Sequence, residues 1–191
     1  MADTQGIMHD PISQFSKPTV QARIAGLGLE NGNQALLDRW FSLWNGDALP
    51  TREQFGPAKI KPFLPSILVF DVVPEESVTA RLAGTAYRYI LGSDPTGLDW
   101  IAAAPENHRE TRLRIFSAVA RGAVLVAHRR IGMLAAKDII SEEILFPLAA
   151  RASGSVPVIV HLNLTHKQVT AMKSITQVTG DPIDTRLVTF V

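Results

Sequence analysis

The stretch VPVIVHLNL, residues 156–164, carries the clearest secondary-structure signal in the chain. Valine or leucine occupies every even-numbered position, whereas Ile159, His161 and Asn163 occupy odd-numbered ones. Side chains of a β-strand point alternately to its two faces, so this period of two predicts a strand with one apolar face. His161 lies opposite that face, where we expect solvent or an interface.

Four further strands are predicted around a long helix. Two β-branched runs, 67–73 and 78–83, flank a turn and predict a hairpin. A helix over 106–121 follows, and the strands 124–131 and 139–148 then precede the stretch 156–164. Pro147 cannot donate to a strand ladder, which predicts an edge position or a bulge for its strand.

This order of elements predicts an α+β fold, a five-stranded antiparallel sheet with helices packed on one face. Residues 34–45 predict an additional N-terminal helix, with Asn33 as its cap. The candidate interface residues on this helix are apolar: Leu37, Trp40, Phe41 and Trp44. Because such a helix cannot remain in solvent, it packs either on its own domain or on a second copy of the chain.

The segments on either side of residues 34–164 are expected to lie outside the domain. Residues 1–33 are polar and interrupted by proline and glycine, which predicts a mobile N-terminal tail. Residues 165–191 form a C-terminal extension, whose last residues are compatible with a further strand or with an arm that reaches a neighbour.

Composition excludes several classes of protein. The 191 residues include no cysteine, which removes disulfide frameworks, zinc ribbons and thiol nucleophiles. A net charge of +1 argues against a general nucleic-acid binder. No apolar run approaches the ~18 residues of a membrane-spanning helix, and the N-terminus lacks the features of a secretion signal. We therefore expect a cytoplasmic protein.

Short motifs occur in a characteristic order between residues 36 and 164. They are LxxW at 37–40, LPTR at 49–52, FGPxxI at 55–60, LPxI at 64–67, RLAGT at 81–85, DxTG at 94–97 and LFPL at 145–148. In this order they resemble the bacterial stand-alone PAS-like domain family, a branch of the PAS sensory domains. The resemblance implies an antiparallel sheet that encloses small helices and a pocket. It implies a sensory module that binds a small molecule, a protein partner or both, with no output domain of its own and no enzymatic activity.

Candidate ligand-binding residues lie on the segments that would cover such a pocket. They are Tyr87, Tyr89, Trp100, His108, Arg112 and Phe116. Arg112 lies one helical turn from His108 and from Phe116, where it could pair with an anionic ligand. The aromatic residues are equally expected in an ordinary core. Some PAS domains hold haem, flavin or metabolites, but the cofactor of this chain stays unknown, and its histidines lack the spacing of a metal site.

Charge and paired carboxylates leave two alternatives open. Residues 106–137 contain seven Lys or Arg and two Glu, a local charge of +5 that suits an adaptor for an acidic partner. A small enzyme or ligand carrier could use the same cavity. However, Glu142 and Glu143 are adjacent in a strand and point to opposite faces, so they cannot share one substrate. Among partners we expect a second copy of the chain, forming a homodimer, and another protein.

Overall fold

The computed structural model describes residues 17–45, 48–131, 139–173 and 183–190. Within these ranges the helical elements, in chain order, are α1 Lys17–Ala25, α2 Asn31–Leu43, α3 Arg52–Phe55, η2 Pro57–Ser66, α4 Thr85–Leu91, α5 Glu106–Ala120 and α6 His166–Lys173. The strands are β1 Ile67–Val73, β2 Ser77–Ala83, β3 Leu125–Ile131, β4 Ile139–Pro147, β5 Val156–Leu162 and β6 Ile183–Phe190. η2 is a 3₁₀ helix, and Pro62 and Pro65 lie inside it.

The strands form one antiparallel sheet in the order β2-β1-β5-β4-β3-β6. The five strands predicted from the sequence are β1 to β5, and this prediction is confirmed with shifts of one or two residues at the strand ends. The sixth strand, β6, comes from the C-terminal extension and pairs with β3 of the same chain.

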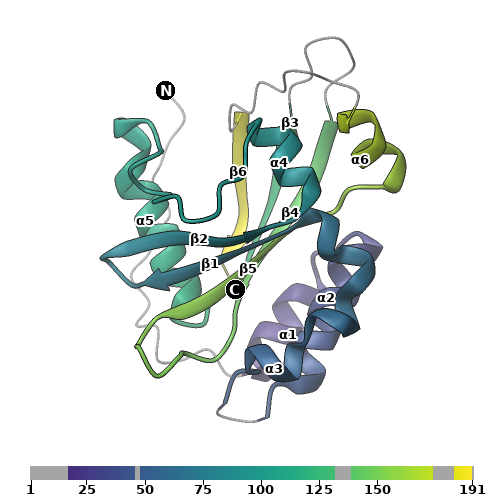
Figure 1. Ribbon diagram of the computed structural model, residues 1–191. Helices are drawn as coiled ribbons and strands as arrows, with labels where there is room; N and C mark the ends of the chain where they lie inside the picture. The colour runs from purple at the N-terminus through teal and green to yellow at the C-terminus, as the bar shows by residue number, and fades with distance from the viewer. Residues whose placement is uncertain (1–16, 46–47, 132–138, 174–182, 191) are drawn as a thin grey trace.

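One face of the sheet packs against α4 and α5 (Figure 1). We call the apolar cluster between them core A. Its members include Phe70 of β1, Val158 and Val160 of β5, and Phe116 of α5. The even-numbered residues of β5 from Val156 to Leu162 belong to this core, as the alternation in the sequence predicts.

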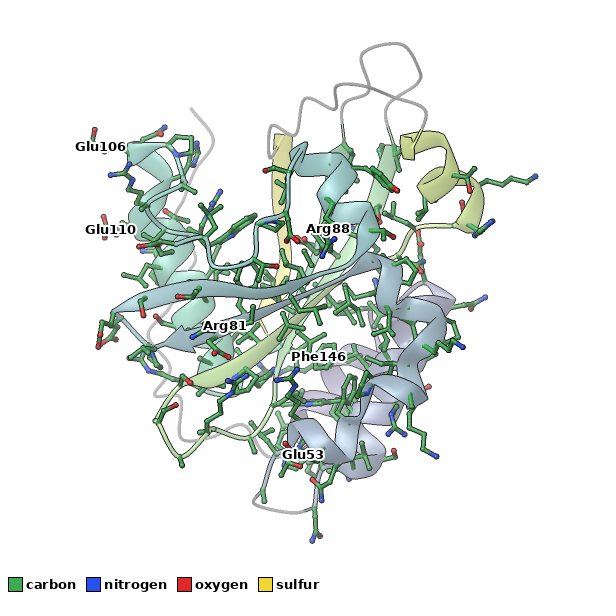
Figure 2. All side chains as sticks on the ribbon, in the orientation of Figure 1. Glu53, Arg81, Arg88, Glu106, Glu110 and Phe146 are labelled. Atoms are coloured by element: carbon green, nitrogen blue, oxygen red, sulfur yellow. The ribbon has the colours of Figure 1, made fainter. Side chains whose placement is uncertain are left out.

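The opposite face packs against α1, α2, α3 and η2, so helices cover both faces and not a single one (Figure 1). We call this second cluster core B. Its central residue is Trp40, which is fully buried and donates a hydrogen bond from Nε1 to the carbonyl oxygen of Pro147, 2.7 Å away. The Trp40 ring packs 5.8 Å from that of Phe146, centroid to centroid. Figure 2 shows Phe146 on this side, away from Glu106 and Glu110 of α5.

The N-terminal segment differs from its prediction. Residues 17–33 are not a mobile tail, because α1 packs into core B through Val20 and Ile24, whose side chains are almost completely buried. Residues 1–16 of the predicted tail lie outside the described residues. Helix α2 begins at Asn31 with Glu30 as its N-cap, so Asn33 is not a cap but a buried residue of the first turn.

The four candidate interface residues of α2 pack within their own chain. They are Leu37, Trp40, Phe41 and Trp44, all buried in core B. The apolar helix could pack on its own domain or on a second copy of the chain, and the structure shows packing on its own domain. The prediction of these four residues as an interface with another chain is wrong, because no more than 7% of any of them is accessible.

Candidate functional site

An aromatic cluster lies between the sheet and α5, where a pocket was expected. The Phe70 ring contacts those of Phe116 and Trp100, with centroid distances of 4.8 and 5.1 Å. Arg112 covers the Trp100 ring at 5.1 Å and donates a hydrogen bond from Nη1 to the Trp100 carbonyl oxygen, 2.8 Å away. Three predicted site residues thus lie in one cluster: Trp100 and Phe116 each contact Phe70, and Arg112 contacts Trp100. A ligand entering this region would have to displace one of these rings.

The other three predicted ligand-binding residues are more dispersed. Tyr87 is buried in core A, and Tyr89 packs partly buried against it. His108 is exposed in the first turns of α5 and does not belong to the cluster. The structure therefore does not bring His108 and Arg112 together on the interior. Phe70, which the site prediction missed, is signalled in the sequence only as one apolar residue of a strand.

A buried polar network joins the first turn of α2 to β4 and β5 on the other side of the sheet. Asn33 donates from Nδ2 to Glu142 Oε1 at 2.8 Å, and its Oδ1 lies 2.6 Å from His161 Nδ1. His161 Nε2 lies 3.1 Å from Ser66 Oγ. The backbone N–H of Glu30 also donates to Glu142 Oε1, at 3.0 Å. All of these residues except Glu30 are at most 5% exposed.

The contacts of Asn33 fix the tautomer of His161. A carboxylate only accepts hydrogen bonds, so the Asn33 amide nitrogen faces Glu142 and its oxygen faces the imidazole. His161 must then carry its proton on Nδ1, and Nε2 accepts the hydroxyl proton of Ser66. Burial lowers the pKa of His161 to about 4, so the ring is neutral at pH 7. The expectation of solvent or an interface around His161 is wrong, since helices cover this face.

The sequence of contacts Ser66–His161–Asn33 has the connectivity in which a histidine activates a serine nucleophile. Their burial argues against such chemistry, because Ser66, the last residue of η2, is only 5% exposed. The physical effect of the contacts is to hold α2 against the sheet with every one of these polar groups partnered.

The two adjacent glutamates point to opposite faces, as predicted. Glu142 contacts α2 on the core B side. Glu143 pairs with Leu162 across the ladder, and Leu162 belongs to core A. Both carboxyl groups are buried, at 4% and 3% exposure. They therefore lie on either side of one strand and cannot act on a common substrate.

In the ranges that the structure describes, no group of three His, Cys, Asp or Glu is arranged to hold a metal ion. Among the same residues, none of the helices combines the length and apolar character needed to cross a membrane.

Comparison with known sequences agrees with the architecture. The model of the PAS domain family matches residues 30–162, which include α2, the five strands β1 to β5 and the helices between them. No curated protein matches the sequence. The match covers well over half of the chain, and the chain therefore belongs to the PAS domain family. PAS domains are typical of sensory and signalling proteins.

Proposed function

We propose that this chain is a non-enzymatic PAS sensory module. Binding of an occupant on the core A side changes the contacts that attach α1 and α2 to the opposite face of the sheet. The occupant on the core A side is a small molecule or a protein segment, and the signal passes to another protein. Family membership supports the sensory role. The observation that carries the proposal is the double attachment of Asn33, to His161 on β5 and to Glu142 on β4.

β4 and β5 connect the two cores, because consecutive residues of each strand face opposite sides of the sheet. Val160, the neighbour of His161, belongs to core A, and Glu143, the neighbour of Glu142, faces the same side. A shift of either strand that accommodates an occupant near Phe70 and Trp100 would also move His161 or Glu142. Because hydrogen bonds lose strength over a few tenths of an ångström, Asn33 would respond to that shift. An occupant can bias this equilibrium only by binding one of the two arrangements better.

The first experiment is native mass spectrometry of freshly purified protein, read beside the denatured mass. Extra mass that is lost on denaturation identifies a bound small molecule, and a bare mass favours a protein partner as the occupant. The same spectrum tests the homodimer, whose interface would have to use residues other than the four buried on α2.

The second experiment measures hydrogen exchange of the α2 amides with and without the occupant. We expect occupancy to change the protection of residues 31–43 in the wild-type protein. In an Asn33→Leu variant that still binds, this coupling should be lost. Unchanged protection of α2 on full occupancy would contradict the proposal.

A further inference from the structure

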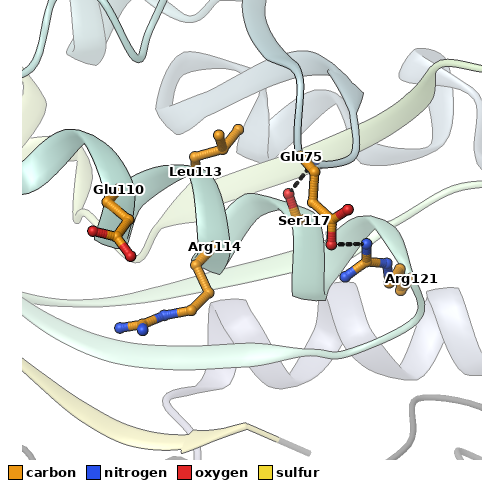
Figure 3. A pocket seen from close by; sticks show the side chains of 6 residues that line it. All are labelled: Glu75, Glu110, Leu113, Arg114, Ser117 and Arg121. Atoms are coloured by element: carbon orange, nitrogen blue, oxygen red, sulfur yellow. Dashed lines mark hydrogen bonds and ion pairs between the residues drawn. The ribbon is translucent and has the colours of Figure 1, made fainter.

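A shallow groove runs along α5 beside the β1–β2 turn (Figure 3). It has a volume of about 290 Å³. The residues that line it are Glu75 from the β1–β2 turn and Glu110, Leu113, Arg114, Ser117 and Arg121 from α5 and its end. Small-molecule pockets span roughly 300–1,000 Å³, so the groove suits a few side chains of a partner better than an enclosed cofactor.

One wall of the groove, the turn at Glu75, is held against α5 by two contacts. Glu75 has a φ of +64°, the only non-glycine residue with positive φ among those described. Its backbone N–H donates to Ser117 Oγ at 2.7 Å, and its carboxylate pairs with Arg121. A left-handed conformation costs energy for a residue other than glycine, and it persists where the surroundings impose it. The turn is thus fixed against α5, and the groove is present before any partner arrives.

The charges in the groove are only partly paired. Arg121 is paired with Glu75, as the dashed line in Figure 3 shows. Arg114 is exposed, and the structure gives its guanidinium no hydrogen bond or ion pair within the described residues. Glu110 lies one turn before Arg114, at the spacing that favours an ion pair, yet within the same residues the two do not pair. A cation and an anion therefore both remain available beside the half-buried Leu113.

This combination favours one kind of partner. A polyanion such as duplex DNA would meet the carboxylates of Glu75 and Glu110 at the two ends of the groove. A peptide can instead alternate its charges to match. We propose that the groove is a docking site for a short peptide segment of a protein partner. The segment places an apolar side chain on Leu113, a carboxylate on Arg114 and a basic side chain on Glu110.

This inference builds on the proposed function by locating the surface that meets a protein partner. The test uses the ¹⁵N-labelled full chain, titrated with the acetylated peptide Ac-Gly-Lys-Leu-Glu-Gly-NH₂ and followed by the amide chemical shifts. Shifts should concentrate at residue 75 and over 110–121. Raising the salt concentration from 50 to 300 mM should weaken binding at least twofold, since the contacts are exposed charges.

A charge exchange makes the test specific. Arg114→Glu should weaken binding at least fivefold, and binding should return when the peptide glutamate is replaced by lysine. Arg23→Glu on α1 is the matched control, because Arg23 is also exposed, makes no contact with a carboxylate within the described residues, and lies far from the groove in sequence. It should bind like the wild type. The spectrum of each variant also reports that it is folded.

Several outcomes would overturn the inference. They are the absence of shifts in the groove at millimolar peptide, equal binding by wild type and Arg114→Glu, and shifts of the same amides by duplex DNA. The proposed function fails separately. If the groove binds no peptide while occupancy still alters α2 protection, only the docking site is wrong. If the peptide binds as expected and no occupant alters α2, the sensory mechanism is wrong and the groove stands.

Discussion

Nδ1 of His161 lies 2.6 Å from Oδ1 of Asn33, so a neutral imidazole on β5 holds the first turn of α2. A hydrogen bond this short between buried groups has no competition from water. The contact links a residue of the family-matched sheet to the helix that covers it, 128 positions away in the sequence. Its contribution to the free energy of unfolding can be measured with variants of either residue.

Acid should loosen the fold through His161. The folded-state pKa of about 4 lies below the ordinary value of 6.5. Between these values the unfolded chain binds a proton that the folded chain does not, so stability is full above pH 6.5 and falls as the pH decreases toward 4. At about 1.4 kcal/mol per pH unit, the decrease amounts to about 3 kcal/mol. Urea unfolding at several pH values measures it.

His161→Gln provides the comparison for this pH dependence. The variant cannot take up the proton, so its free energy of unfolding should change less between pH 6.5 and 4 than that of the wild type. Carboxyl groups titrate in both proteins over this range. Only the difference between the two slopes of unfolding free energy against pH is due to His161. Identical slopes would show that burial does not lower the pKa of His161 in the folded state.

Replacing Asn33 should cost more than its size suggests. Asn33→Leu keeps the branched shape and the number of heavy atoms but removes the donor to Glu142 and the acceptor of His161, leaving two buried polar groups short of partners. We expect a loss of about 2–4 kcal/mol in the free energy of unfolding. Gln34→Leu is the matched control, since within the described residues the side-chain amide of Gln34 bonds only the exposed Asp38. Its effect should stay within about 0.5 kcal/mol.

The indole of Trp40 should stabilise the fold through the hydrogen bond of its N–H as well as through the apolar surface that it buries. Trp40→Phe removes the hydrogen bond to the buried Pro147 carbonyl and leaves a gap in core B. We expect a loss of about 2–3 kcal/mol. Trp44→Phe tests the separation of these effects, because Trp44 is also buried but its ring nitrogen has no hydrogen bond within the described residues. An equal loss in both variants would mean that the Pro147 contact adds nothing.

Gly84 is required by close packing and not by its backbone conformation. Its φ is −65°, which any residue adopts, but a Cβ at this position would meet the backbone oxygens of Leu64 and Pro65. Gly84→Ala should therefore destabilise the fold by about 1–3 kcal/mol. Gly26→Ala should be nearly neutral, because its Cβ would make an ordinary contact with Arg23 O at 3.6 Å. Chemical denaturation of the two variants compares them directly.

The strands were predictable because each carries its own local signal. Alternation over 156–162 and β-branched runs elsewhere fix the strands and, for β5, which side chains face core A. What the sequence does not reveal is that helices also cover the second face. This explains why His161 was expected near solvent and the α2 residues at an interface, although all of them are buried.

The polar network was not predictable for a related reason. Asn33 is a good N-cap by composition, and only the positions of Glu142 and His161 show that it belongs inside the helix. Pro147 was expected at an edge or a bulge, yet β4 is an interior strand. Pairing with β3 ends at Leu145, so the missing N–H of Pro147 falls beyond that ladder. Each error concerns a partner that is distant in the sequence.

The position of β6 affects whether the sheet can associate edge to edge with other copies of the chain. The family match ends at residue 162, and without β6 the strand β3 would present an unpaired backbone at the sheet margin. Such a margin is a template for growth of the sheet by strands of other chains. The C-terminal segment occupies it, and its pairing with β3 is interrupted by two register shifts. An irregular strand with Asp184 and Arg186 in its sequence is a poor template. Pairing with β6 thus removes from β3 the free edge at which a strand of another chain could add.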